Sequence, residues 1–422
     1  MKDREVSKLE GLLFAVLIVC NNVVVNFIGE ISVGFIFIVA TSLIWFPRLN
    51  MKNPMLFSLF WLYVALICAQ GVSEMFSSTT MTLKLKGIAV TINSLIVFLY
   101  FLYRYYLHLD FVKYYFLASA IARILIPDIL SKIEGSEFGY YKFTLVPILI
   151  NLLFFVALMA QQKVNRKIIA LVIGVVGGYF IVTGARSEGL ILFAAGVSSF
   201  LVLCVGRFIS KKIIYRIGVM LAVVAYIAYA QIYVPMVLRG ELDDVGNSKQ
   251  LKKADNPYNP LYLIMEGRTD SLVPFIAFAD KPSVGFGYFA KDPNFKYNNL
   301  LFQLKSGTKG AKKDYEYDME IIPAHSVVGC YAVSYGIGGL VFMLLIVGRI
   351  LDLGVLTLLR RDQYIYVVAF FLFNICWHLL FSPAAHFKTG IPIMGAFIVA
   401  LYMRQIYEPK LYSSLCKCDL VQ

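Results

Sequence analysis

The sequence consists of long apolar runs that are interrupted by one long polar stretch, residues 236–324. Hydrophobic residues make up 59% of the 422 residues and charged residues only 15%, and the mean hydropathy is +0.73. Soluble domains are typically about 45–50% apolar and about 25% charged. A run of about 20 apolar residues allows a helix to cross the hydrocarbon core of a bilayer. The pattern therefore predicts an integral membrane protein built from transmembrane helices.

Twelve apolar runs are candidate transmembrane helices. They are 11–27, 31–46, 55–70, 87–103, 111–126, 145–160, 168–183, 189–206, 217–234, 327–347, 364–381 and 391–403. This spacing predicts helices 1–9 in residues 1–235, a large loop in 236–324, and helices 10–12 with a tail in 325–422. The expected fold class is an all-α polytopic membrane protein with about twelve transmembrane helices and one large external loop.

The net charge of +13 lies in the short connections, because the 236–324 loop holds twelve Lys/Arg and twelve Asp/Glu and is neutral. With the N-terminus in the cytoplasm, twenty basic residues of the short connections fall on the cytoplasmic side and six on the other. Basic residues favour the cytoplasmic side, so we expect both termini there and the large loop outside. A basic excess spread in this way argues against a nucleic-acid-binding surface.

The loop has local patterns of its own. Thr269-Asp270-Ser271 predicts the start of a helix over residues 269–278, because hydroxyl and carboxylate side chains cap free N–H groups. The proline and glycines of residues 281–287 predict a turn. Many aromatic residues in the loop suit sugar rings, although aromatic residues are also common at membrane surfaces.

Two arginines near the expected outer surface are candidates to bind anionic groups. Arg186 lies in the turn Thr-Gly-Ala-Arg-Ser-Glu-Gly, and Arg268 precedes the predicted loop helix. A guanidinium group offers five donors in a geometry that matches phosphate and carboxylate. Arg186 can equally reach lipid headgroups or pair with Glu188. Arg268 can equally form a solvated ion pair with Glu266 or Asp270.

A histidine follows the loop directly, in Pro323-Ala324-His325-Ser326. Histidine exchanges protons near neutral pH, so His325 is a candidate general acid or base. The alternative is an interfacial histidine held by the backbone. Glu320, a few residues earlier, can act as a base or be a solvated loop charge.

Three more residues are candidates to bind substrate. Arg123 lies inside the fifth run, where a charge is by default a functional candidate, although it can also pair with Asp128. His386 and Lys388 share the last outer loop. The sequence contains no glycine-rich nucleotide loop or paired metal-ligand motif, so no cofactor and no metal are predicted.

Taken together, these segments resemble the bacterial O-antigen polymerase and O-antigen ligase superfamily of membrane glycosyltransferases. Three local patterns carry the resemblance: the arginine turn at 183–189, the run from Gly267-Arg268 to Gly285-Phe286-Gly287, and His325 followed by the glycine-rich 335–340. Serine follows His325 where ligases usually have asparagine, and the tryptophan often seen after the loop arginine is absent. Both differences weaken the resemblance to ligases.

The resemblance implies a GT-C-like fold and an oligosaccharide repeat-unit polymerase of the bacterial inner membrane. Such an enzyme joins undecaprenyl-diphosphate-linked oligosaccharides into O-antigen or capsule-type polysaccharide on the periplasmic face, with no nucleotide and no metal. It also implies a chain-length regulator and a flippase as partners. The catalytic residues implied are His325, Arg186 and Arg268, and the substrate-binding candidates are Arg123, Glu320, His386 and Lys388.

Two other functions remain open from the sequence. One is the ligase, which transfers the glycan to lipid A-core. The other, from a different class, is a lipid-linked oligosaccharide flippase. A flippase should place charges deep in many spans and lack a large outer loop, whereas most charges here lie at the ends of the apolar runs.

Overall fold

The computed structural model describes residues 8–26, 30–49, 51–126, 137–205, 229–240, 256–259, 269–306 and 320–407, with the single positions 216, 223, 226 and 227. Five helices are long and apolar enough to cross a membrane. They are α4 (Pro54–Met75), α5 (Met81–Leu107), the π-helical turn η2 (Tyr141–Leu145) with α9 (Val146–Ala160), α11 (Arg186–Val205) and α18 (Val327–Leu359). The protein is therefore a largely α-helical membrane protein, as the composition predicts.

Shorter elements complete the described chain. The N-terminal part has α1 (Lys8–Cys20), β1 (Val24–Asn26), β2 (Glu30–Ser32), α2 (Val33–Ala40), α3 (Ser42–Trp45) and η1 (Phe46–Arg48). The middle has α6 (Phe111–Leu125), α8 (Glu137–Tyr140), α10 (Arg166–Val182), η4 (Tyr229–Tyr233), α13 (Val234–Leu238), α16 (Thr269–Asp280), η5 (Pro293–Phe295) and α17 (Lys296–Ser306). The C-terminal part has α19 (Ile365–Phe381), α20 (Ala385–Lys388) and α21 (Gly390–Tyr407).

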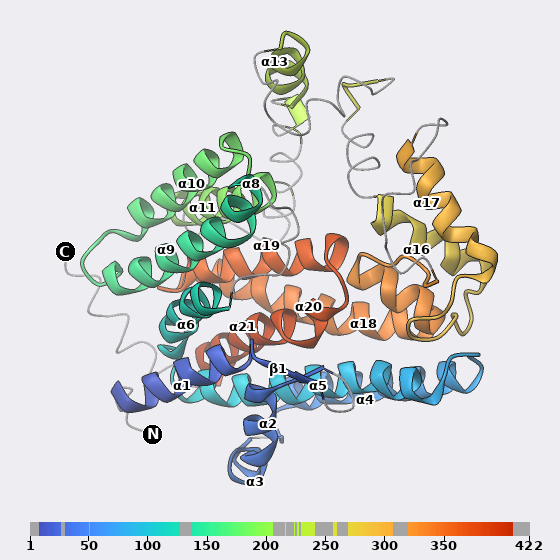
Figure 1. Ribbon diagram of the computed structural model, residues 1–422. Helices are drawn as coiled ribbons and strands as arrows, with labels where there is room; N and C mark the ends of the chain where they lie inside the picture. The colour runs from blue at the N-terminus through green and yellow to red at the C-terminus, as the bar shows by residue number, and fades with distance from the viewer. Residues whose placement is uncertain are drawn as a thin grey trace.

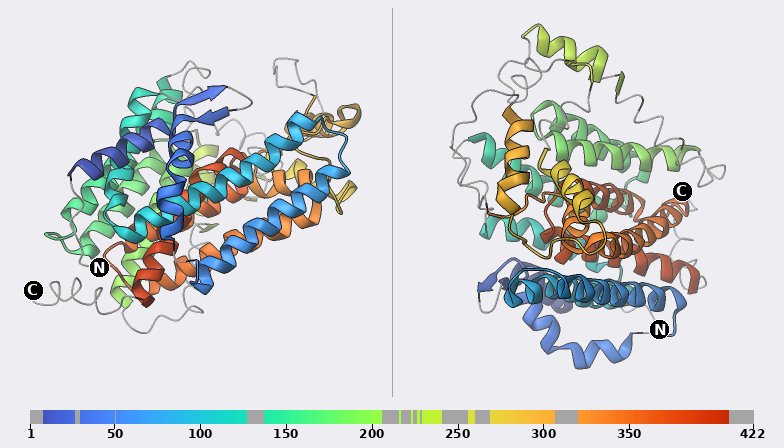
Figure 2. Two further views of the ribbon diagram at one scale, coloured as in Figure 1. Left: turned by 90° about the horizontal axis from the view of Figure 1, so that it is seen from below. Right: turned by 90° about the vertical axis from the view of Figure 1, so that its right-hand side faces the viewer.

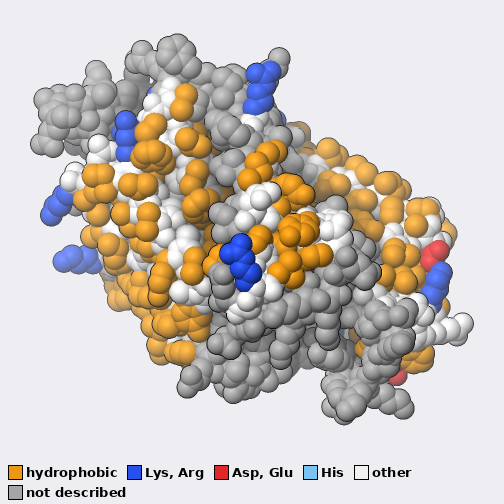
Figure 3. All heavy atoms as spheres, turned by 90° about the horizontal axis from the view of Figure 1, so that it is seen from above, with side chains coloured by type: hydrophobic (Ala, Val, Ile, Leu, Met, Phe, Trp, Pro, Cys, Tyr) orange, Lys and Arg blue, Asp and Glu red, His pale blue; other side chains and the backbone are white. Residues whose placement is uncertain are grey.

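The long helices run side by side, and α16 and α17 lie at the right of Figure 1, above the right-hand ends of α18, α4 and α5. Figure 2 shows the same arrangement from below and along the bundle. Seen from above, hydrophobic side chains cover much of the described surface, with only scattered Lys and Arg (Figure 3). Such a surface suits contact with lipid.

Most predicted spans coincide with helices, but the count of twelve stays a prediction. The runs at 111–126 and 168–183 form α6 and α10, and the last two runs form α19 and α21, of 17 and 18 residues. Half of the run at 217–234 lies outside the described residues. The loop helix predicted over 269–278 is confirmed as α16, whereas α17 was not predicted.

The first two predicted spans are wrong as continuous helices. α1 ends at Cys20, and β1 pairs with β2 in an antiparallel hairpin. Consecutive valines at 23–25 favour an extended chain, because β-branched side chains fit a strand better than a helix. Ser32 then caps α2, its Oγ accepting a hydrogen bond from Phe35 N at 3.1 Å. A break at Thr41 separates α2 from α3.

Glycines allow α10 and α11 to pack closely. A Cβ on Gly177 would lie 2.3 Å from Phe193 N, and one on Gly196 would lie 2.3 Å from Gly174 N. Both contacts are with backbone of the facing helix, so no side chain fits between the two helices at these positions. A Cβ on the neighbouring Gly178 would be 4.0 Å from its nearest atom, a side-chain carbon of Phe193.

A polar network joins the helix ends opposite α16 and α17. Asp362, 3% exposed, accepts hydrogen bonds from Gln405 Nε2 at 3.0 Å and from Tyr364 N at 3.1 Å. Arg166 Nη1 donates to Arg361 O at 3.1 Å. Burial raises the pKa of Asp362 to about 6. The ends of α18 and α21 and the starts of α10 and α19 therefore meet here.

Candidate functional site

We define the α16–α17 lobe as residues 269–306 and 320–326. A turn of this lobe inserts into a break in α18, where Gly336 leaves helical geometry with φ 63° and ψ −156°. Three backbone hydrogen bonds join the segments: Phe286 N to Val333 O (2.8 Å), Gly287 N to Ser334 O (2.9 Å) and Ile337 N to Pro282 O (2.7 Å). A break in a membrane helix requires partners for its freed polar groups, and the turn supplies them.

A buried carboxylate fixes the same turn from α4. Glu74, 3% exposed, accepts a hydrogen bond from Tyr288 N at 2.9 Å through Oε1. Its Oε2 accepts from Ser77 Oγ at 2.6 Å and from Thr79 Oγ1 at 3.1 Å. Three donors compensate the burial of the carboxylate, so Glu74 anchors the lobe to the bundle.

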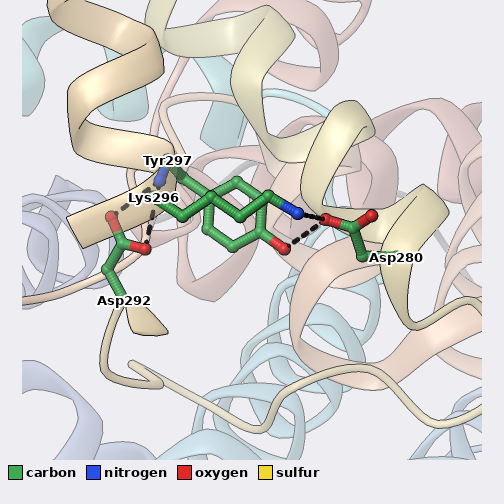
Figure 4. Close-up of polar contacts among 4 residues, drawn as sticks. All are labelled: Asp280, Asp292, Lys296 and Tyr297. Carbon is green, nitrogen blue, oxygen red and sulfur yellow. Dashed lines mark hydrogen bonds and ion pairs between the residues drawn. The ribbon is translucent and has the colours of Figure 1, made fainter. Parts of the chain in front are cut away.

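Inside the lobe, a polar cluster joins α16 to α17 (Figure 4). Asp280 accepts hydrogen bonds from Lys296 Nζ and Tyr297 Oη, both at 2.6 Å. These bonds lower the pKa of Asp280, whereas burial raises the pKa of Tyr297. Asp292 accepts from the backbone N–H groups of Tyr297, at 3.0 Å, and Asn298, at 2.7 Å, near the start of α17. Each carboxylate thus has structural partners.

His325 lies at the junction of the lobe and α18. Its N–H donates to Asp270 O at 3.2 Å, and its C=O accepts from Ser271 Oγ at 3.4 Å. Ser326 caps α18, because its Oγ accepts a hydrogen bond from Gly329 N at 2.9 Å. The side chain of His325 is exposed. The lobe therefore fixes the backbone of His325 while its imidazole remains accessible.

Glu320 and Arg268 are the other two site residues predicted for this region. Glu320 forms an ion pair with Lys291 at 3.0 Å, in which the two side chains are 63% and 83% exposed. An exposed pair of this kind contributes little energy, and its geometry favours the interpretation of Glu320 as a solvated charge. Arg268 lies outside the described residues, so its role as an anion-binding residue stays a prediction.

A second set of residues meets where α6, η2, α11, α19 and α20 begin or end. We call it the basic cluster. Its members are Arg123, Lys142, Arg186, Glu188, His378, His386 and Lys388. Every one of these side chains is half-buried. Of the predicted site residues, Arg123 and His386 both interact with His378, Arg186 begins α11, and Lys388 follows His386 on α20.

Arg123 and Lys142 both lie near one carboxylate. Glu188, in the first turn of α11, interacts electrostatically with both of them. Arg123 Nη1 also donates to Phe143 O at 3.4 Å. Asp128, the partner considered from the sequence, lies outside the described residues. Since two cations lie near Glu188, this part of the cluster carries a net positive charge.

Arg186 occupies the opposite side of the start of α11. Its guanidinium carbon lies 4.9 Å from the ring centroid of Tyr233, a cation–π contact. The preceding turn needs Gly184, whose φ is 98°, and Thr183 Oγ1 lies 2.5 Å from Tyr141 Oη. These contacts hold Arg186 against η4.

His378 and His386 form a stacked pair. Their ring centroids are 3.9 Å apart and their planes differ by 16°. His378 Nδ1 lies 2.9 Å from Ser382 Oγ, and His378 also interacts electrostatically with Arg123. The sequence places His378 inside an apolar run and gives no reason to join it to Arg123. The spacing of four residues between His378 and Ser382 is the one feature of the sequence that indicates a polar contact of this histidine.

The lobe and the basic cluster lie toward the same end of the bundle. The ring of Phe387, between His386 and Lys388, contacts the rings of Tyr331 at 5.0 Å and Tyr63 at 6.2 Å. Tyr331 follows His325 by six residues, which corresponds to about 9 Å of helix rise. His325 therefore lies closer to the lobe, along the axis of α18, than the point at which α20 packs on this helix.

The donor set of these groups suits an anion better than a metal. Among the described residues, no group of three or more His, Cys, Asp or Glu is placed to hold a metal ion. Arginine, lysine and imidazole N–H groups instead match phosphate oxygens. The sequence matches no protein-family model, and no curated protein matches it either.

Proposed function

We propose that the protein is a membrane glycosyltransferase that joins lipid-diphosphate-linked oligosaccharide repeat units, at the outer face of a bacterial cytoplasmic membrane. The observation that carries this proposal is the basic cluster. Arg123 and Lys142 lie near Glu188, the stacked His378 and His386 lie beside Arg123, and Arg186 begins α11; all are half-buried at the ends of apolar helices. Half-buried cations in excess of carboxylates suit an anionic ligand, and a lipid-linked diphosphate reaches this place from the bilayer.

The reaction needs no nucleotide, because the donor already carries an activated bond. The bond between the anomeric carbon of the growing chain and its lipid diphosphate breaks, and a bond to a hydroxyl oxygen of the incoming unit forms. The hydroxyl proton leaves to a base, and the lipid diphosphate departs with the electron pair. Arg186, with Arg268, would stabilise the charge on the departing diphosphate.

His325 is the proposed base or acceptor-positioning group. Its exposed imidazole and its anchored backbone support this role. Ser326, which stands where O-antigen ligases usually have asparagine, caps α18. Serine and asparagine are both favoured at this position, so the difference leaves the local fold unchanged. The serine alone therefore argues only weakly against a ligase.

Incubation of the purified protein with a lipid-diphosphate-linked oligosaccharide as the single substrate tests the proposal. A ladder of longer glycans supports the polymerase. Product that forms only after a lipid A-core acceptor is added would identify a ligase instead. Absence of any glycan product, together with movement of the intact lipid-linked oligosaccharide across proteoliposomes, would identify a transporter.

A further inference from the structure

The basic cluster divides into two parts on different faces of α11. Arg186 and Glu188 are two residues apart, and side chains at this spacing do not face each other on a helix. Arg186 accordingly contacts Tyr233 of η4, whereas Glu188 interacts with Arg123 of α6 and Lys142 of η2. An anion bound by Arg186 is therefore not in the same position as one bound beside Arg123.

The part beside Arg123 contains the stacked histidines. His378 interacts with Arg123 and with His386, whose ring is parallel to its own at 3.9 Å. A proton on either imidazole is disfavoured by the neighbouring guanidinium, and two imidazolium rings this close would also repel each other. The carboxylate of Glu188 interacts electrostatically with both Arg123 and Lys142. An added anion relieves this repulsion and accepts hydrogen bonds from both kinds of donor.

Backbone polarity favours the same ligand. His386 Nδ1 lies close to Gly390, the first residue of α21, since a Cβ built there would be 3.6 Å from it. The first N–H groups of this 18-residue helix add partial positive charge near the imidazole. Phe387 inserts between Tyr331 and Tyr63 and so fixes α20, which carries His386.

We propose that His378 and His386, together with Arg123, form a second anion-binding subsite that takes a phosphate-type group. The identity of that group rests on the proposed function. A polymerase must hold two lipid diphosphates, and the subsite on the far side of α11 from Arg186 takes that of the acceptor lipid.

Binding of inorganic pyrophosphate to the full-length protein, in nanodiscs of zwitterionic lipid, tests the subsite by calorimetry. The double variant His378→Asn, His386→Gln should bind at this subsite about 10- to 100-fold more weakly, as expected for losing hydrogen bonds to a charged group. Arg186→Gln should leave this binding step in place. His108→Gln, which changes the histidine that packs on Phe111 at the other end of the bundle, is the matched control and should bind like the wild type.

The single variant His386→Gln serves if the double variant does not fold, because it keeps the contact of His378 with Ser382. Size-exclusion profiles identify folded variants. Unchanged pyrophosphate affinity in a folded pair variant would refute the subsite, whether or not the protein polymerises glycans. Affinity that depends on the pair, without glycan product in the polymerisation assay, would leave the subsite standing and reject the proposed function.

The source of the phosphate group is separated by two further probes. Farnesyl diphosphate should compete with pyrophosphate at this subsite, as expected for a lipid diphosphate. Displacement by nanodiscs that contain anionic phospholipid, without competition by farnesyl diphosphate, would assign the pair to ordinary headgroups and overturn the acceptor assignment.

Discussion

Replacing Gly336 by alanine should release the α16–α17 lobe from the bundle. Gly336 has φ 63° and ψ −156°, a region that is essentially restricted to glycine, and occupying it with another residue costs about 1–3 kcal/mol. A Cβ there would also lie 2.6 Å from Ser283 O and 2.7 Å from Pro282 O. Both are backbone atoms, so the turn must move and its three hydrogen bonds to α18 are disrupted.

The expected loss is about 4–6 kcal/mol, taking about 1 kcal/mol for each hydrogen bond with the backbone strain. Hydrogen exchange with mass spectrometry, on peptides covering residues 282–288, measures it directly. Protection in Gly336→Ala should fall by roughly 10³- to 10⁴-fold, since every 1.4 kcal/mol is a factor of ten. Gly348→Ala is the control on the same helix, because a Cβ there meets nothing within 4 Å. Equal protection in the two variants would refute the proposed docking.

Four further predictions concern catalysis and stability. His325→Ala should lower glycan polymerisation by about 10²–10⁴-fold at equal membrane levels, as for loss of a general base, and near-normal chain length would exclude that role. Arg186→Lys should also lose most activity, because lysine keeps the charge but not the planar fork, and full activity would remove Arg186 from the site. Gly177→Ala should lower the melting temperature, whereas Gly178→Ala should not, and equal melting temperatures would contradict the close packing of α10 on α11. Asp362 has a pKa of about 6 in the folded protein against an ordinary 3.8. Its stabilising effect is therefore complete below about pH 4, and roughly 3 kcal/mol of folding stability is lost as the pH rises through 6. Thermal unfolding from pH 4 to pH 8 should show this loss in the wild type but not in Asp362→Asn, and identical profiles would refute it.

Local chemistry explains why parts of the lobe are predictable from sequence. The capping residues at 269–271 predict α16, and the proline and glycines of 281–287 predict the turn that precedes α17. The position of His325 beside the start of α18 also follows, since a polar stretch ends there and an apolar run begins. These features depend on neighbouring residues, so the order of residues along the chain suffices to find them.

Hydropathy is a poorer guide where a single helix and an interrupted one would come from runs of the same length and polarity. The valines at 23–25 add to an apolar run, yet they belong to a hairpin that ends α1 early. The run that begins at Val327 reads as one span, yet α18 breaks at Gly336 because a turn about fifty residues earlier bonds the freed backbone groups. A window of residues contains no information on such a distant partner.

The sequence by itself determined the class of protein, a helical membrane protein, and the candidate list: arginines near the ends of apolar runs and a histidine where the long polar stretch ends. Only the tertiary structure decided which candidates meet. It brings Arg123 near Glu188, stacks His378 on His386, and places Arg186 on another face of α11. The physical reason is that composition and spacing act within one helix, whereas a binding site depends on which helices pack together and on the rotation of each about its own axis.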